Sequence, residues 1–219
     1  MDAEAQYTQT LDTWDAIADL YAQKFMDMPI YHATYDQFLL HIPSPEPVIL
    51  DAGCGPGAIT KYILSKRPDA QITATDFAPA MIALAAQVNP QANCMVADLR
   101  THPNTEATYN GIICGFALPY LHHADGYAWI AQAYRALIQG GIFYVSFVEG
   151  DSARSGPKQN SRGGTVWFHY YSEKEMEGYL HTLGFDLLHT AHVPYPGVGE
   201  TQDHVIMIAQ KNSATSTTT

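Results

Sequence analysis

The sequence has 219 residues, of which 47% are hydrophobic and 15% are charged, and its formal net charge at pH 7 is −11. A chain of this size and apolar content can bury one sizeable core, which excludes wholesale disorder. The acidic balance argues against nucleic acid as the main partner, because a phosphate backbone requires a basic protein face.

Cysteine usage and the absence of long apolar runs indicate the compartment. The three cysteines are far apart and include no C-x-x-C pair, which favours a reducing cytosol over a disulfide framework. The first residues lack the basic and apolar regions of a signal peptide, and no apolar run approaches the ~20 residues that span a bilayer. We therefore expect a cytoplasmic protein that does not bind a membrane.

Helices are predicted before the first strand. An apolar stripe at three- and four-residue spacing, which includes Trp14 and Tyr21, predicts one amphipathic helix over residues 13–28. A second helical pattern covers residues 31–41 and ends before a proline-rich linker. We interpret residues 1–46 as a helical lid in front of a larger domain.

Strand and helix patterns then alternate along the middle of the chain. Strands are predicted at residues 48–50, 72–75, 94–97, 110–114 and 142–148. Helices are predicted at residues 58–66, 79–88 and 125–138, the last of them ended by Gly140 and Gly141. Such alternation requires a parallel sheet with helices on both faces and right-handed crossovers, so we predict a doubly wound α/β fold.

The last third of the chain departs from this alternation. The polar, glycine- and serine-rich stretch at residues 150–164 predicts a mobile loop. Ser172 is then placed to cap a helix, with Glu175 completing a capping box. Two more strands, at residues 185–193 and 205–210, are predicted to form a hairpin.

The most informative segment is the loop after the first strand, Asp51-Ala52-Gly53-Cys54-Gly55-Pro56-Gly57. Glycines here let the backbone turn sharply and approach a ligand, and the helix that follows offers free N–H groups. The spacing of Gly53, Gly55 and Ala58 also satisfies the dinucleotide-binding pattern G-x-G-x-x-[GA]. This loop alone therefore permits a dinucleotide site, another nucleotide ligand, or a tight turn that binds nothing.

Three acidic residues at consecutive strand ends distinguish these possibilities. Asp51 lies inside the turn, where its charge would repel a pyrophosphate and hold a cationic ligand. Asp76 closes the second strand, where a carboxylate can accept both hydroxyls of a ribose, and Asp98 closes the third, near an adenine amine. This pattern predicts a cationic, ribose-bearing adenosine ligand, which is S-adenosylmethionine.

At these residues the sequence resembles the class I S-adenosylmethionine-dependent methyltransferases. Residues 49–57 are similar to the family's first motif, residues 75–81 to its second and residues 96–99 to its third. The resemblance implies a Rossmann-like, mostly parallel seven-stranded sheet of order 3-2-1-4-5-7-6 whose last strand is antiparallel. It also implies a cofactor-binding domain at residues 47–211, followed by a tail at 212–219 that we expect to be disordered.

The resemblance also assigns the cofactor contacts. Asp51 and Gly53 would lie by the methionine moiety, Asp76 would bind the ribose hydroxyls, and Phe77 and Leu99 would flank the adenine. The full expected cofactor-binding set is Tyr21, Asp51, Gly53, Cys54, Gly55, Asp76, Phe77, Met81, Asp98, Leu99, Gly115 and Phe116.

Histidine and aromatic side chains after the fourth strand are the candidates for the acceptor site. The expected substrate-binding residues are Tyr120, His122, His169 and Tyr170. His169 is also the candidate general base, since an unperturbed imidazole titrates near ~6.5 and accepts a proton at neutral pH. The ten histidines include no H-E-x-x-H pair, so no metal site is expected.

Composition and motifs together favour a small-molecule acceptor, methylated by in-line displacement. Ala117-Leu118-Pro119-Tyr120 faintly resembles the motif of methyltransferases that act on nucleic-acid bases, but it lacks their acidic or amide residue. Two alternatives stay open: an NAD(P)-dependent oxidoreductase, which the glycine spacing permits and the acidic residues oppose, and a non-catalytic module that binds S-adenosylmethionine. The motifs do not distinguish O, N, S or C methylation, or one oligomeric state from another.

Overall fold

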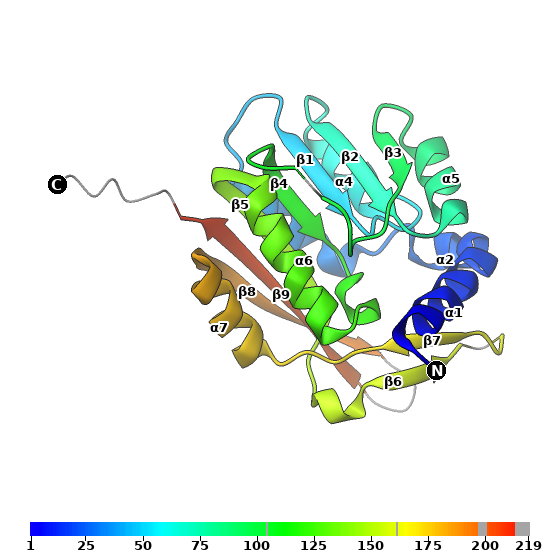
Figure 1. The fold of residues 1–219 in the computed structure, drawn as a ribbon. Helices are drawn as coiled ribbons and strands as arrows, with labels where there is room; N and C mark the ends of the chain where they lie inside the picture. Colours follow the sequence, from blue (N-terminus) through cyan, green and yellow to red (C-terminus); the bar gives the residue numbers. More distant parts are fainter. Residues whose placement is uncertain (104, 161, 197–200, 213–219) are drawn as a thin grey trace.

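Seven strands form one sheet through the middle of the molecule, in the order β3-β2-β1-β4-β5-β9-β8 (Figure 1). The computed structural model describes residues 1–103, 105–160, 162–196 and 201–212. Strands β1 to β5 are parallel, whereas β9 is antiparallel to both of its neighbours, β5 and β8. The predicted order 3-2-1-4-5-7-6 is confirmed, because two further strands, β6 and β7, lie outside this sheet.

The strands that the sequence predicts are all present, with bounds close to those expected. The strands of the sheet are β1 (Val48–Ala52), β2 (Gln71–Asp76), β3 (Asn93–Val96), β4 (Tyr109–Cys114), β5 (Leu137–Val148), β8 (Phe185–Pro196) and β9 (Thr201–Lys211). The α-helices are α1 (Ala3–Ala16), α2 (Ala18–Phe25), α3 (His32–Leu40), α4 (Ala58–Lys66), α5 (Pro79–Val88), α6 (His123–Ala136) and α7 (Glu173–Leu183).

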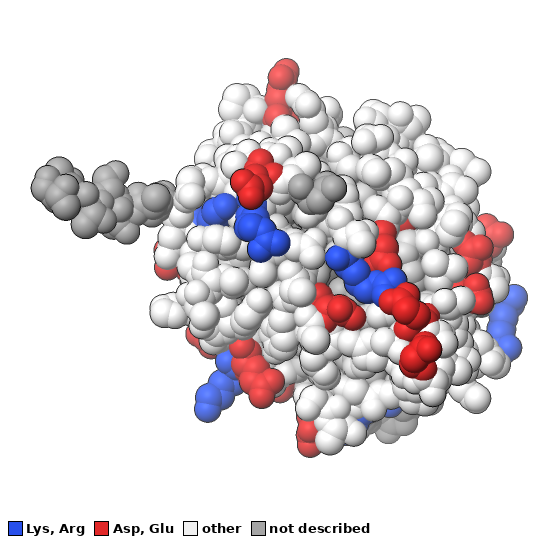
Figure 2. Space-filling model, in the orientation of Figure 1, with Lys and Arg blue, Asp and Glu red and all other residues white. Residues whose placement is uncertain are grey.

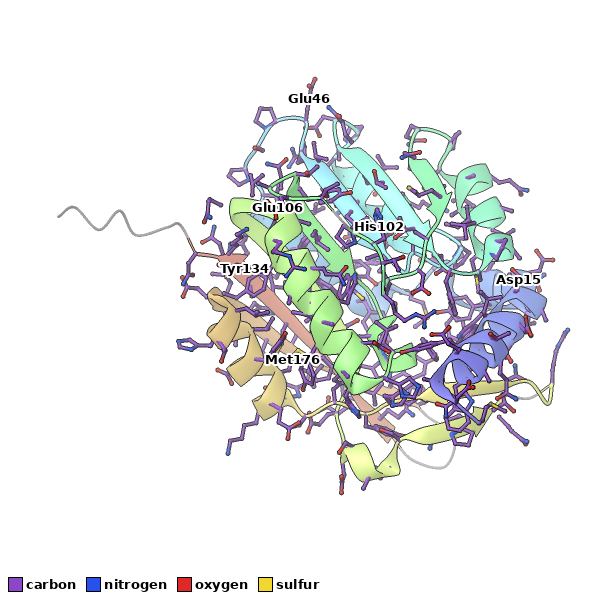
Figure 3. The ribbon with its side chains drawn as sticks, in the orientation of Figure 1. Asp15, Glu46, His102, Glu106, Tyr134 and Met176 are labelled. Carbon is purple, nitrogen blue, oxygen red and sulfur yellow. The ribbon has the colours of Figure 1, made fainter. Side chains whose placement is uncertain are left out.

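Helices cover both faces of the sheet, which explains why its central strands are almost wholly apolar. Along β5, Phe143 and Val145 join the core cluster beneath α6 and α7, whereas Tyr144 joins the cluster beneath α3 and α4. This alternation follows from the pleat, since successive side chains point to opposite faces. Figure 3 labels Tyr134 on α6 and Met176 on α7, the two helices that share the first of these faces.

The N-terminal segment differs from the predicted helix at residues 13–28. It forms two helices, α1 and α2, which meet at Ile17. The start of α1 was missed because the residues it buries before position 14 are Tyr7, Thr10 and Thr13, which make no apolar stripe. The signal that could have located it is Asp2, whose carboxylate accepts a hydrogen bond from the Ala5 amide at 2.9 Å.

The predicted end of the helix at residues 125–138 is also wrong. Helix α6 ends at Ala136, and Leu137 already pairs with Tyr109 as the first residue of β5. Gly140, with φ +74°, lies inside β5 near the point where its register with β4 shifts, so it does not cap the helix. Leu137 is buried, and a buried leucine at this position fits both the spacing of a helix and that of a strand. The boundary between α6 and β5 therefore could not be located from the sequence pattern.

The stretch at residues 150–164 is not simply a loop. It contains a 3-10 turn, Ser152–Arg154, and strand β6 (Gly156–Gln159), which pairs antiparallel with β7 (Thr165–Phe168). The β6–β7 hairpin lies along α1 (Figure 1). Trp167 anchors it, because its amide donates to Thr10 Oγ1 at 3.0 Å and its indole donates to Gln9 Oε1 at 2.9 Å.

The C-terminal elements agree with the sequence analysis. Ser172 caps α7, and its Oγ accepts a hydrogen bond from the Glu175 amide at 3.5 Å. Strands β8 and β9 form the predicted antiparallel pair. The predicted disordered tail falls almost entirely on residues 213–219, outside the described residues. Within the described ranges, no helix has the length and apolar character needed to cross a membrane.

Candidate active site

The glycine loop joins β1 to α4 at the carboxyl edge of the sheet. Gly53, Gly55 and Gly57 have φ values of +72°, +54° and +88°, a backbone region that favours glycine. A Cβ on Gly53 would come within 2.2 Å of the Ala117 Cβ, so this position also lacks the space for a side chain. The amides of Gly53 and Cys54 both donate to the Thr75 carbonyl, at 2.7 and 2.8 Å. The loop is thus bound to the end of β2.

Asp76, the last residue of β2, faces this loop. Its carboxylate accepts hydrogen bonds from the amides of Gly55 and Ala78, each at 2.9 Å. The side chain is nearly buried, and burial raises the pKa of Asp76 to about 6. The structure therefore holds this carboxylate in one orientation at the rim of the sheet.

Asp51 occupies a different place from the one expected. It is fully buried and lines neither of the cavities described below. Its Oδ2 accepts a hydrogen bond from Thr60 Oγ1 at 2.6 Å, whereas its Oδ1 has no hydrogen-bond partner. Burial raises the pKa of Asp51 to about 7, and the nearby Asp76 contributes to this shift. Asp51 is thus a buried carboxyl group with one unpaired oxygen.

Asp98 also differs from expectation, because its charge is compensated. The guanidinium of Arg100 donates to the Asp98 carboxylate from Nε at 2.9 Å and from an NH2 nitrogen at 2.6 Å. The same guanidinium pairs with Glu4 and lies 4.1 Å from the ring centre of Tyr7, both on α1. Asp98 thus lies at the sheet edge, as predicted, and its ion pair with Arg100 also links this edge to α1.

A first cavity of about 640 Å³ opens above the glycine loop. Every residue of the expected cofactor-binding set lines it, apart from Asp51 and Cys54. Trp14, Ala117 and Leu121 also line this cavity and were not among the predicted site residues. The full lining is Trp14, Tyr21, Gly53, Gly55, Asp76, Phe77, Met81, Asp98, Leu99, Gly115, Phe116, Ala117, Tyr120 and Leu121.

The residues of this cavity fit an adenosine ligand. Gly53 and Gly55 leave the floor without side chains, and a buried carboxylate, Asp76, stands beside the apolar side chains of Met81 and Leu99. A carboxylate can accept the two hydroxyls of a ribose, and apolar side chains can enclose an adenine ring. The Asp51 Oδ1 atom below, buried and unpaired, adds a negative potential that favours a cationic group.

A second cavity of about 1150 Å³ adjoins the first. The wall that the two share consists of Trp14, Tyr21, Gly53, Gly55, Gly115, Phe116 and Tyr120. Its other lining residues come from α2, α3, α4, β5, β7, β8, β9 and the segments between elements, and many are aromatic. None of the described lining residues is Lys, Arg, Asp or Glu. A ligand in this cavity would lie next to a ligand in the first.

His204 is the functional candidate that the sequence analysis missed. It lines the second cavity, and its Nδ1 is 2.6 Å from the Tyr31 hydroxyl. Its position follows from topology: β9 is antiparallel to β5, so its early residues reach the carboxyl edge, where His204 pairs with Val148. The sequence signal that could have identified His204 is its place, as a polar residue, at the start of an apolar strand that the predicted fold makes antiparallel.

The expected acceptor residues divide into two groups. Tyr120 lines both cavities, whereas His122, His169 and Tyr170 line neither. The ring of His169 packs 4.6 Å from that of His122. Phe168 faces the second cavity, and the next residue along the extended chain points the other way. The geometry therefore does not support His169 as a base.

Comparisons with known proteins agree with this site. Residues 49–141 match the family described as "Methyltransferase domain". The trans-aconitate 2-methyltransferase of Variovorax paradoxus is 30% identical over 110 residues, 50% of this chain and 42% of that protein. A malonyl-[acyl-carrier protein] O-methyltransferase of Acetivibrio thermocellus is 62% identical over 34 residues, 16% of this chain and 12% of that protein. The chain thus matches less than half the length of these curated relatives.

Solved structures share the whole fold. The Burkholderia thailandensis 1,6-didemethyltoxoflavin-N1-methyltransferase, with bound 1,6-didemethyltoxoflavin and S-adenosylhomocysteine, has a TM-score of 0.75 at 21% identity and covers 97% of this chain and 92% of its own. The complex of DhpI with SAH has a TM-score of 0.73 at 18% identity, and the match covers 96% of this chain and 99% of that chain. The fold is the Rossmann-like fold of these solved structures, and residues 49–141 match the methyltransferase-domain family.

Cofactor affinity should fall as the pH decreases below 7. Burial raises the pKa of Asp51 to about 7 and that of Asp76 to about 6, and a cationic, ribose-bearing ligand favours the ionised form of both carboxylates. Protonation of each group then weakens cofactor binding by up to about tenfold for every pH unit below the pKa of that group in the free protein. We expect calorimetry to show S-adenosylmethionine binding at least ~10-fold more weakly at pH 5.5 than at pH 8.

The buried imidazoles His169 and His204 do not interfere with this measurement, because burial lowers the pKa of each to about 4. The Asp76→Asn variant serves as the comparison, since it should lose the lower of the two titration steps. Equal dissociation constants at pH 5.5 and pH 8 in the unaltered protein would contradict the linkage.

Proposed function

We propose that this protein transfers the methyl group of S-adenosylmethionine to a small molecule held in the second cavity. The observation that carries the proposal is the wall the two cavities share around Gly115 and Phe116. Because these residues line both cavities, a donor in the first cavity and an acceptor in the second would lie next to each other, as an in-line displacement requires. The small-molecule acceptors named for the relatives support this class of substrate.

The residues of the first cavity bind and orient the cofactor. Asp76 accepts hydrogen bonds from the ribose hydroxyls, and Met81 and Leu99 hold the adenine between them. Gly53 and Gly55 let the ligand lie directly against the backbone. When bound, S-adenosylmethionine supplies a methyl group activated by its sulfonium. The protein therefore needs only to align an acceptor and to exclude water.

Exclusion of water is the role we propose for residues 1–46, the predicted lid, over the cofactor-binding domain at residues 47–211. Trp14 packs edge-to-face on Tyr21 at 5.2 Å and on Tyr120 at 5.1 Å, and all three residues line both cavities. Asp15, labelled in Figure 3, accepts a hydrogen bond from the Ala80 amide at 2.7 Å and so ties α1 to α5.

An NAD(P)-dependent oxidoreductase is the weaker alternative. A pyrophosphate bound by a glycine loop requires loop amides that are free to donate. Here the Gly55 amide donates to Asp76, and the Gly53 and Cys54 amides donate to Thr75. The loop amides are thus occupied within the protein, and a carboxylate stands where a phosphate would lie.

We also propose a cytosolic protein that acts without nucleic acid or membrane. Cys54, Cys94 and Cys114 are all free thiols, which suits a reducing compartment. In the view of Figure 2, basic and acidic side chains lie beside one another in small groups, and no continuous basic patch crosses that face.

Two measurements test the function. Thermal denaturation with S-adenosylhomocysteine or NAD should show a higher Tm with the first compound only. Incubation of the protein and methyl-labelled S-adenosylmethionine with a metabolite extract should then place label in the small-molecule fraction. Stabilisation by NAD alone would favour the oxidoreductase, and binding of S-adenosylhomocysteine without any transfer would favour a non-catalytic module.

A further inference from the structure

The second cavity has aromatic walls that also carry hydroxyl, amide and imidazole groups. Tyr31, Phe116, Tyr120, Phe168 and Tyr195 present rings to it, and no described lining residue carries a charged Lys, Arg, Asp or Glu side chain. A carboxylate or phosphate bound here would therefore lose its hydration without meeting the permanent positive charge of a Lys or Arg side chain. Flat aromatic walls instead suit a planar, uncharged ring, which can stack on them.

One hydrogen-bonded pair, Tyr31 and His204, stands out in this cavity. Tyr31 and His204 are 5% and 7% exposed, so both are held within the wall. The hydroxyl of Tyr31 lies 2.6 Å from Nδ1 of His204, and Nε2 of His204 lies 3.4 Å from Gln202 Oε1. The ring of Tyr195 stacks on that of His204 at 4.8 Å, and the ring of Phe116 lies 4.7 Å from that of His204.

The surroundings keep this pair uncharged. Burial lowers the pKa of His204 to about 4 and raises that of Tyr31 well above its usual range. The groups around His204 are Tyr31, Phe116 and Tyr195 from other elements, with Gln202 and Asp203 on its own strand. Asp203 is the one acid among them, and it also accepts a hydrogen bond from His192. A protonated Tyr31 hydroxyl thus donates to a neutral Nδ1, which leaves the Nε2 proton for Gln202.

We propose that the acceptor is a planar, uncharged aromatic compound that carries an N–H or O–H group, and that Tyr31 and His204 receive the proton lost on methylation. This inference rests on the proposed methyltransferase function. It adds the chemical class of the acceptor and two residues to which no role was assigned above.

The proton transfer balances within these residues. The acceptor heteroatom bonds to the methyl carbon, and the carbon–sulfur bond breaks with its electron pair left on sulfur. The acceptor proton passes to Tyr31 Oη while the Tyr31 proton passes to His204 Nδ1. The resulting imidazolium, with its Nε2 proton held by Gln202, returns one proton to solvent and restores the neutral pair.

Some acceptors named for the relatives differ in chemistry from this cavity. Trans-aconitate is an anion, and an enzyme that binds it needs cationic side chains or other strong donors around its carboxylates. The described lining of this cavity offers no Lys or Arg for that purpose. We therefore expect this chain to reject carboxylates of the same size and shape as its acceptor.

A binding experiment tests the acceptor class without any turnover. The protein, saturated with S-adenosylhomocysteine, is titrated with 2-naphthol and with 2-naphthoate at pH 7.5 in a calorimeter. These probes share one ring system and differ in charge. We expect 2-naphthol to bind at least ~10-fold more tightly, which is the ratio that a difference of about 1.4 kcal/mol produces. Equal binding, or tighter binding of 2-naphthoate, would overturn the assignment.

Two variants test the Tyr31–His204 pair. With the acceptor found by the labelling screen, Tyr31→Phe and His204→Asn should lower kcat at least ~10-fold, a loss typical of a missing general base. The dissociation constant for S-adenosylhomocysteine should stay within twofold. The deficit should shrink as the pH approaches the pKa of the acceptor, because an ionised acceptor no longer needs a base.

Matched controls lie on α7, away from both cavities. Tyr179→Phe removes a hydroxyl that donates to the Tyr127 carbonyl, and His181→Asn removes an exposed imidazole, so neither should change kcat. A pH-independent deficit in the cavity variants would reduce the pair to a structural role and overturn the inference. If no label is transferred to any compound, the proposed function fails. The naphthol titration still decides which class of compound the second cavity binds. Repeated with Tyr31→Phe and His204→Asn, the titration also decides whether the pair contacts the naphthol ring.

Discussion

Replacement of Asp76 by alanine is expected to weaken S-adenosylhomocysteine binding by about 10- to 100-fold, equivalent to about 1–3 kcal/mol for a lost pair of charge-assisted hydrogen bonds. Asp76 lines the first cavity and is the one acidic residue there that no cation neutralises among the described contacts. The same change leaves the Gly55 and Ala78 amides without their acceptor, so the glycine loop should also lose order.

Calorimetry measures the affinity, and chemical denaturation measures the free energy of unfolding. Asp76→Asn separates the two effects, because an amide oxygen still accepts from one backbone amide but carries no charge. Asp151→Ala is the matched control: Asp151 also caps a backbone amide, that of Ala153 at 2.8 Å, but lies outside both cavities. A dissociation constant that stays the same in Asp76→Ala would remove the ribose-binding role.

Replacement of Gly53 by alanine should be the most damaging single change in the loop. The new side chain would occupy a left-handed backbone position and meet the Ala117 Cβ at 2.2 Å. We expect a loss of about 2–4 kcal/mol in the free energy of unfolding, about 1–2 from the backbone and the rest from overpacking. Cofactor binding should fall below detection, since the shift needed to relieve the contact moves the cavity floor.

Two further variants divide this loss into its parts. Gly163→Ala places a methyl group at φ +81° in open space, so it should show the backbone contribution alone, about 1–2 kcal/mol. Adding Ala117→Gly to Gly53→Ala removes the colliding atom and should restore the remainder. Denaturation of the four proteins measures each term. A Gly53→Ala protein as stable as Gly163→Ala would show that the contact with Ala117 is relieved without strain.

The site residues show how far sequence reasoning reached. Gly53, Gly55 and Asp76, which the sequence predicts as cofactor-binding residues, line the first cavity, because a glycine loop after a buried strand and an acid at the next strand end have local signatures. Asp98 was located correctly, but its ion pair with Arg100 was missed. The guanidinium lies only two positions along the chain, and nothing in the sequence says whether it folds back or points into solvent.

His169 and His204 show the opposite limit. Both are histidines among aromatic residues, and their sequence contexts do not rank one above the other. His169 packs on His122, away from the cavities, whereas His204 enters the second cavity and meets Tyr31, 173 positions earlier in the chain. The difference depends on which side of an extended segment faces the cavity, and a shift of one residue would reverse it.

The sequence by itself determined the elements with local causes: the apolar strands of the sheet, the glycine loop, the cap at Ser172, and therefore the doubly wound fold. Backbone conformation and burial periodicity are properties of a few neighbouring residues, and they can be recognised in order along the chain. Only the tertiary structure decided that the β6–β7 hairpin lies on α1, that Arg100 neutralises Asp98, and that β9 brings His204 to Tyr31. These outcomes depend on contacts between distant segments, whose relative position is set by the packing of the whole core.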